Sequence, residues 1–299
     1  AALDPRLRGA DESGGFILPA SALAMPVAAT DLLVDLAGVQ RLRESGDGRF
    51  LLDIRRLAIR PGDRLALVGD SGVGKSTCLD MLALTLAPTT WDRFDASFDS
   101  TTHPIGELWR HGERSALAAL RARHIGYVLQ TGGLLPFLSV LENVALPRRL
   151  LGEAPAEARL AAEKLLARLE MAGYARRLPA DLSLGQRQRV AVARALVHRP
   201  ELVLADEPTA SLDRRNAESV IRLFAELLEE QGRAAIWVTH SAELATAHGF
   251  TPIFCRVQPD EAGGSRSVIC HGELVGELGG EVGGEADGEA GGDTGEGSA

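Results

Sequence analysis

The first guide to the fold is the stretch Gly69-Asp70-Ser71-Gly72-Val73-Gly74-Lys75-Ser76-Thr77. It follows an apolar run at 65–68, which predicts a strand, and it opens a helical pattern at 75–86. Its glycines let successive backbone N–H groups turn toward phosphate oxygens, and the start of a helix adds partial positive charge. We therefore expect a phosphate-binding loop, with Lys75 at the β- and γ-phosphates of a nucleotide and the Ser76 hydroxyl on Mg²⁺.

A second apolar run, at 202–205, ends in two carboxylates, Asp206 and Glu207. In open α/β sheets, ligands bind at the carboxyl ends of the strands, so this run predicts both carboxylates beside the phosphate loop. Oxygen ligands suit Mg²⁺, so Asp206 is expected to hold that ion. Glu207 is expected to orient and deprotonate the water that attacks the γ-phosphate.

Strand-like and helical patterns alternate along the middle of the chain. Apolar runs at 32–36, 125–129, 235–238 and 252–257 predict strands, and helical patterns lie at 156–171, 187–197 and 216–230. In the first of these helical patterns, Ala158, Ala162, Leu165 and Leu169 share one face. This alternation predicts an α/β fold with a parallel sheet.

Charge and composition divide the chain unevenly. The net charge is −9 over 299 residues, but residues 258–299 carry ten acidic residues and one arginine, which leaves 1–257 neutral. A neutral body argues against nucleic acid as a partner. Residues 1–29 and the Gly- and Glu-rich 258–299 are too polar or irregular to form a core, so we expect both to be disordered. Sparse cysteines without CxxC spacing fit a reducing cytosol.

Four further segments complete an ordered set of motifs. Gln130 follows a predicted strand, and residues 182–189 read Leu-Ser-Leu-Gly-Gln-Arg-Gln-Arg. Ser211-Leu212-Asp213 comes soon after the two carboxylates, and His240 follows the last strand but one. With these motifs, residues 31–257 resemble the ATP-binding subunits of ABC transporters.

The resemblance implies roles for the individual residues. The catalytic set would be Glu207, His240 and Gln130, and the Mg²⁺ ligands Ser76, Gln130 and Asp206. The signature that caps the partner subunit's nucleotide would be Ser183, Leu184, Gly185 and Gln186, at the start of a helix whose N–H groups are free. The D-loop would be Ser211, Leu212 and Asp213.

The resemblance also implies an architecture and partners. It implies a P-loop α/β core, a small antiparallel β-subdomain and a helical subdomain at about 131–182, together spanning 30–257. The implied partners are a second copy of the chain in a head-to-tail dimer, closed by ATP, and an integral membrane permease at the cytoplasmic face of the cell membrane. Segments 134–147 and 204–217 resemble the subgroup that serves lipoprotein release, macrolide-type export and cell division.

Two departures from the family pattern keep an alternative open. Leu184 stands where the signature usually has glycine, and by spacing Leu42 stands where an aromatic residue usually stacks on adenine. Leu42, Arg43 or Phe50 could replace that stack in part. The alternative function is a regulatory or slow-cycling ATP-binding module without a transport role. A soluble ABC ATPase of DNA repair or translation is disfavoured, because the chain has neither a long coiled-coil insertion nor a second nucleotide domain.

Overall fold

The computed structural model describes residues 31–45, 48–210, 212–260 and 264–271. The expected disorder of 1–29 lies outside these residues, as does D-loop Ser211. Among the described residues, no helix has both the length and the apolar character needed to cross a membrane.

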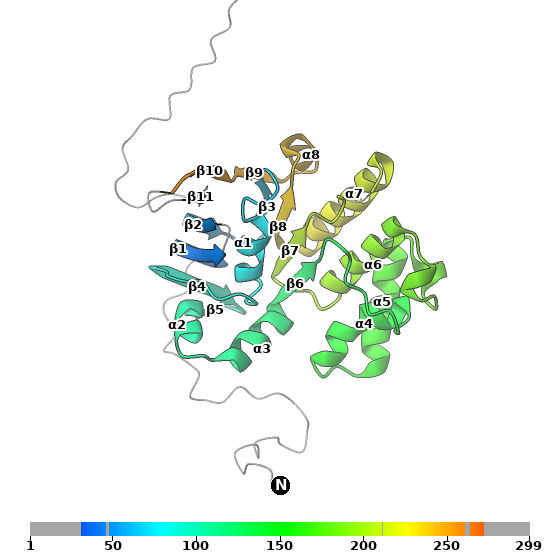
Figure 1. Cartoon of the computed structure of the whole chain (residues 1–299). Helices are drawn as coiled ribbons and strands as arrows, with labels where there is room; N and C mark the ends of the chain where they lie inside the picture. Colours follow the sequence, from blue (N-terminus) through cyan, green and yellow to red (C-terminus); the bar gives the residue numbers. More distant parts are fainter. Residues whose placement is uncertain (1–30, 46–47, 211, 261–263, 272–299) are drawn as a thin grey trace, which may run out of the picture.

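Two sheets organise the molecule (Figure 1). The first has five parallel strands in the order β6 (Ile125–Val128), β7 (Leu202–Asp206), β8 (Ala234–Thr239), β3 (Arg64–Val68) and β9 (Thr251–Phe254). The second has six strands in the order β10 (Arg256–Pro259), β11 (Ser265–His271), β2 (Gly48–Ile59), β1 (Val34–Ser45), β4 (Arg93–Phe98) and β5 (Thr101–His103). The predicted α/β fold, with a parallel core and an antiparallel subdomain, is confirmed.

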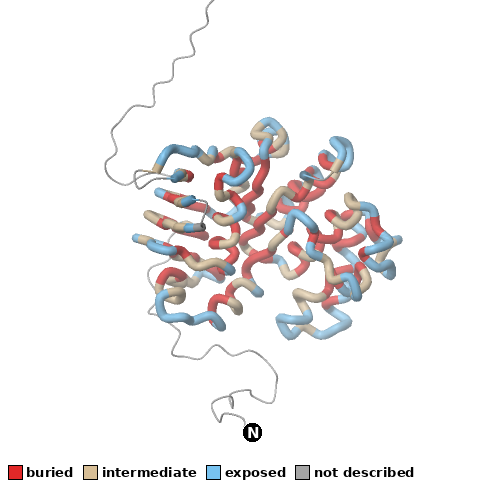
Figure 2. The backbone as a smooth tube through the Cα atoms, viewed as in Figure 1, coloured by how far each residue is buried: buried red, intermediate tan, exposed pale blue. Residues whose placement is uncertain are grey.

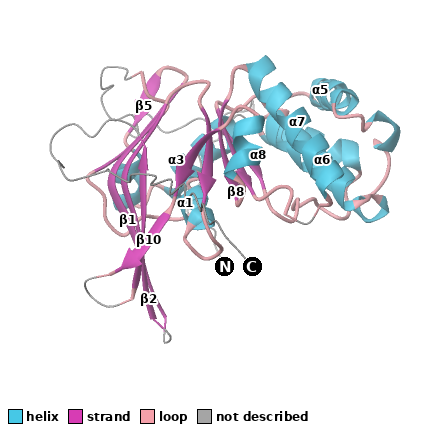
Figure 3. Cartoon of the chain, turned by 90° about the horizontal axis from the view of Figure 1, so that it is seen from above, coloured by secondary structure: helices cyan, strands magenta, loops and turns pink. Residues whose placement is uncertain are grey.

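The helices fill the space around these sheets. In chain order they are α1 (Lys75–Leu82), α2 (Ile105–Arg110), α3 (Arg114–His124), α4 (Val140–Leu150), α5 (Pro155–Arg168), α6 (Leu184–Leu196), α7 (Arg214–Gln231) and α8 (Ala242–Ala247). Seen from above, the strands of the antiparallel subdomain lie on one side of the parallel sheet and α5, α6 and α7 on the other (Figure 3).

Two apolar cores hold this arrangement (Figure 2). One joins the two sheets around α1, whose Cys78, Leu79 and Met81 are fully buried. The other lies between the parallel sheet and helices α4 to α7. Burial of this apolar surface holds the parallel sheet in place between the second sheet on one side and helices α4 to α7 on the other.

The helical segment between β6 and β7 contains a buried polar anchor. Asn143 of α4 is fully buried, and its Nδ2 donates to the carbonyls of Leu135, Leu138 and Ser139. Its Oδ1 accepts the N–H of Leu135 at 2.8 Å. The side chain therefore holds the loop that precedes α4 in one conformation, because each of its polar atoms has a partner.

The expected domain end at 257 is wrong. Strand β11 pairs in parallel with β2, and its Ser267 and Ile269 are fully buried. Only one of these two inward positions is apolar, so the alternation that marks a strand is weak in the sequence. The fold therefore includes residues up to His271, and the rest of the predicted tail, 272–299, lies outside the described residues.

Removing β11 should therefore destabilise the fold. Ending the chain after Val257 removes the strand that covers β2 and the buried Ile269, which is worth about 2 kcal/mol or more of unfolding free energy. The control ends after His271. Urea denaturation of both proteins checks this, and equal midpoints would mean that β11 adds nothing to the fold.

A close approach between β6 and α6 should tolerate no side chain. A Cβ on Gly126 would lie 2.2 Å from the carbonyl oxygen of Ala195, which is backbone and cannot move aside. We expect Gly126→Ala to lower the unfolding free energy by about 1–3 kcal/mol. Gly173→Ala is the matched control, because a Cβ there meets nothing within 4 Å. Chemical denaturation should separate the two variants, and equal stabilities would contradict the close packing.

Candidate nucleotide site

The phosphate loop lies where the sequence predicts it, between β3 and α1. Gly72 and Gly74 have φ angles of 82° and 89°, a region that favours glycine. Lys75 is only 4 % exposed, and its Nζ donates to the carbonyl oxygens of Gly69 and Asp70, at 2.7 Å each. These two bonds hold the loop curled around the ammonium group, so that backbone N–H groups and a positive charge share one cradle.

Strand β7 brings Asp206 to this loop. Asp206 pairs with Val238 of the neighbouring strand β8, and its Oδ1 accepts a 3.0 Å hydrogen bond from Ser76 Oγ. Burial raises the pKa of Asp206, and the hydrogen bond from Ser76 opposes this effect. A carboxylate and a hydroxyl at this distance are the oxygen donors that Mg²⁺ prefers, so the residues fit that ion.

Glu207 leaves the strand in an unusual conformation. Its φ is 42°, which is uncommon for a residue other than glycine and is found at functional sites. Its Oε1 lies 2.7 Å from His240 Nε2 and 3.8 Å from Lys75 Nζ. The turn after β7 therefore aims this carboxylate between the phosphate loop and the histidine that follows β8.

Lys75, Ser76 and Glu207 line a cleft of about 1000 Å³, whereas Asp206 and His240 are not among the residues that line it. The predicted residues that line it are Ser71, Gly72, Gly74, Lys75, Ser76, Thr77, Gln130 and Glu207. The backbone of Gln130 is held in place, because its carbonyl accepts a 2.6 Å hydrogen bond from Nε2 of the buried Gln188 on α6. The cleft thus has phosphate-binding, acidic and amide groups on one wall.

Of the three residues expected to replace the missing stack on adenine, two line the cleft. Arg41, Arg43 and Phe50 line the cleft, whereas Leu42 does not. Side chains alternate across a strand, so a register error of one residue exchanges the two faces. Arg43 pairs directly with Phe50 of β2, and Phe50 packs against Gly74, where an added Cβ would lie 3.0 Å from the ring.

Sequence reasoning missed seven of the described residues that line the cleft, which are Arg41, Gly48, Arg49, Asp80, Leu86, Gly264 and Ser265. Asp80 of α1 reaches the cleft, and Gly264 and Ser265 reach it through β11. The helical spacing from Ser76 to Asp80 was a usable signal, since residues four apart share a helix face. No comparable signal marks Gly264 and Ser265, because they follow from the pairing of β11 with β2.

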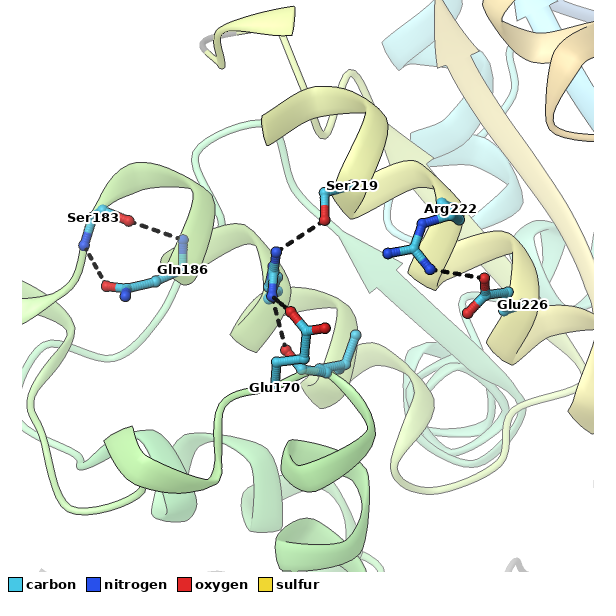
Figure 4. Close-up of polar contacts among 8 residues, drawn as sticks. Glu170, Ser183, Gln186, Ser219, Arg222 and Glu226 are labelled. Carbon is cyan, nitrogen blue, oxygen red and sulfur yellow. Dashed lines mark hydrogen bonds and ion pairs between the residues drawn. The ribbon is translucent and has the colours of Figure 1, made fainter. Parts of the chain in front are cut away.

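Of the described residues, neither the signature residues 183–186 nor the D-loop residues Leu212 and Asp213 line this cleft. Ser183 caps α6, its Oγ accepting the N–H of Gln186, while Gln186 Oε1 accepts the N–H of Ser183 (Figure 4). Asp213 caps α7 by accepting the N–H of Asn216 at 3.1 Å. The structure therefore separates the predicted residues into a cleft group and a group at the starts of two helices.

Comparison with known proteins agrees with this geometry. The family described as ABC transporter matches residues 52–210. The lipoprotein-releasing system ATP-binding protein LolD of Idiomarina loihiensis is 41 % identical over 68 % of this chain and 85 % of its own length. The uncharacterized ABC transporter ATP-binding protein YbbA of Escherichia coli is 40 % identical over 71 % of this chain and 90 % of its own.

Solved structures give the same result. The ATP-binding cassette MJ0796, solved as a dimer with ADP and Pi, has a TM-score of 0.64 and 33 % identity over 74 % of this chain and 93 % of its own. CbiO1 from Clostridium perfringens, part of the cbiONQ transporter complex, has a TM-score of 0.63 and 27 % identity, covering 75 % and 85 %. The match of family, fold and cleft shows that this chain belongs to the ABC transporter family, as an ATP-binding and ATP-hydrolysing subunit.

Proposed function

We propose that this chain powers a membrane permease by closing a head-to-tail dimer of itself around ATP and opening it after hydrolysis. One observation carries the proposal: signature residue Ser183 and D-loop residue Asp213 stand at helix starts outside the chain's own cleft. A second copy turned head to tail would present these helix starts to the γ-phosphate. The dimeric MJ0796 structure supports this assembly.

Within one cleft, the phosphate loop would bind the triphosphate through its backbone N–H groups and Lys75. Ser76, Asp206 and Gln130 would hold Mg²⁺, which neutralises charge between the β- and γ-phosphates when bound. The residues around Ser76 are already arranged for this, since its hydroxyl lies 3.0 Å from Asp206 Oδ1. Little reorganisation would therefore be needed on binding.

Glu207 would act as the general base. The water oxygen forms a bond to the γ-phosphorus, the bond from the γ-phosphorus to the bridging oxygen breaks, and Glu207 takes the water proton. His240, 2.7 Å from the same carboxylate, would hold Glu207 in place and contact the γ-phosphate. Hydrolysis removes the phosphate that joins the two subunits, which makes ATP a two-state switch.

The helical segment offers a surface for the permease. Phe137, in the loop that Asn143 anchors, is 74 % exposed and lies just after Gln130 in the chain. An exposed aromatic side chain on a fixed loop suits an apolar partner helix. The permease would hold the dimer at the inner face of the cell membrane, and the likeness to LolD favours lipoprotein release or related export.

Purification of the chain from detergent-solubilised membranes tests the permease partner. We expect an integral membrane protein to copurify in near-stoichiometric amount, identified by mass spectrometry. Recovery of the chain without a membrane protein, under conditions that preserve such complexes, would favour the regulatory ATP-binding module instead.

Replacing the general base should separate binding from chemistry. We expect Glu207→Gln to lower ATP hydrolysis at least about 100-fold, because the amide cannot take the water proton. Nucleotide affinity should stay close to that of the parent, since the phosphate loop is unchanged. Phosphate release and binding of a fluorescent ATP analogue measure the two quantities. An unchanged hydrolysis rate would remove Glu207 from its role.

Leu184 decides between the transport ATPase and the slow-cycling alternative. It begins α6 and is half-buried, and its backbone N–H, which a phosphate would use, does not depend on its side chain. We expect Leu184→Gly to change turnover by less than about threefold, a barrier change below about 1 kcal/mol. Leu184→Ala is the control for helix propensity. A gain of tenfold or more in both variants would mean that the leucine obstructs closure and would favour the slow-cycling module.

A further inference from the structure

Arg189 joins three helices and has no part in the function proposed above. It lies on α6, five residues beyond Leu184, where that helix begins, and its side chain is 17 % exposed. Its Nη2 donates to Ser219 Oγ of α7 at 2.9 Å, and its Nη1 donates to Glu170 Oε2 at 2.6 Å and to the Leu169 carbonyl at 3.3 Å. Glu170 and Ser219 are labelled in Figure 4.

The bonds of Arg189 to Glu170 and to Ser219 differ in their exposure to water. Glu170 has a side chain that is 64 % exposed, so water and salt weaken its ion pair with Arg189. The bond to Ser219 is part-buried and reaches the helix that Asp213 caps. The Ser219 arm therefore ties α6 to α7, whereas the Glu170 arm ties α6 only to the end of α5.

A second contact lies one turn nearer the helix starts. A Cβ added at Gly185 would lie 3.6 Å from the side chain of Asn216, so α6 and α7 approach each other there with room for little more than a methyl group. Asn216 in turn donates from Nδ2 to Asp213 Oδ2 at 2.5 Å. The helices α6 and α7 therefore lie near each other at two levels, at Gly185 and Asn216 and at the Arg189–Ser219 hydrogen bond.

An arginine is suited to this position. Its planar guanidinium presents several N–H groups at fixed angles and can bind three acceptors at once, which a single ammonium group does less well. The three acceptors here come from two segments, Leu169 and Glu170 at the end of α5 and Ser219 on α7. Removing the guanidinium would leave a part-buried hydroxyl and a carbonyl to find new partners.

We infer that Arg189 is a positioning residue that makes α6 and α7 move as one unit. Signature residues Ser183 and Gln186 and D-loop residue Asp213 then reach the partner subunit's nucleotide together. The inference rests on the proposed closure of the dimer by ATP. It assigns to Arg189 no contact with nucleotide, so its effect falls on assembly of the composite site and not on binding within one cleft.

The experiment uses the full chain in the Glu207→Gln background, where the closed dimer should accumulate. The ATP concentration for half-maximal dimerisation is measured by light scattering, and binding to the monomer by a fluorescent ATP analogue. We expect Arg189→Met to raise that concentration about tenfold, as for a lost charged hydrogen bond, while binding to the monomer is unchanged. Arg189→Lys, which keeps a donor, should recover part of the loss.

Three further variants sharpen the test. Ser219→Ala should reproduce part of the Arg189→Met effect, and the double variant should be no worse than Arg189→Met alone, because both remove one interaction. Glu170→Gln should change dimerisation little. Arg222→Ala is the matched control, since Arg222 lies on α7 and its ion pair within the described part of the chain is with Glu226, four residues along the same helix, at 3.0 Å (Figure 4).

Each outcome bears on the inference. Dimerisation of Arg189→Met at the parent concentration would overturn it, and so would additive effects of Arg189→Met and Ser219→Ala. If Arg189→Met does not fold, Ser219→Ala carries the test, and its dimerisation at the parent concentration would overturn the inference. If the Glu207→Gln parent itself does not dimerise with ATP, the proposed closure fails first, and the inference with it.

Discussion

Everything in the nucleotide site depends on parallel strands ending at one edge. Register places Val68 beside Thr239 and Asp206 beside Val238, so the residues that follow β3, β7 and β8 converge. That convergence puts Glu207 within reach of both Lys75 and His240. Lys75 and Glu207 are both largely withdrawn from water, and such charges persist only if each has a partner, because an isolated buried charge is costly. The carbonyls of Gly69 and Asp70 supply part of that compensation for Lys75.

The same constraint explains which features the sequence predicts well. The phosphate loop and the end of β7 each carry an apolar run followed at once by chemistry-bearing residues, and both lie where expected. Their local patterns and their place in the sheet agree, so one level of structure supports the other. The fold class and the family followed from these segments together with the order of the remaining motifs.

Features that depend on pairing between distant segments were harder to predict. Strand β11 is a strand because β2 offers it an edge, and its buried Ser267 gives no apolar signal. The choice between Leu42 and Arg43 depended on the register of β1 against β2, which spacing in one strand does not fix. The start of α6 at Leu184, and not at 187, follows from the reciprocal bonds of Ser183 and Gln186. Such a capping pair is visible in sequence only when the helix start is already known.

The two groups of functional residues meet different physical demands. Residues of the cleft sit on a sheet edge fixed by two buried cores, which suits groups that must hold charges in place. Ser183 and Asp213 sit at helix starts, where capping already uses a side-chain oxygen as an acceptor. Capping leaves the Ser183 hydroxyl hydrogen free to donate, and it leaves the N–H groups of Leu184 and Gly185 outside the helical ladder. A capped helix start is therefore both internally stable and still a donor surface for an anion. Because those donors belong largely to the backbone, a leucine in place of glycine alters the shape of this surface more than its capacity to bind phosphate.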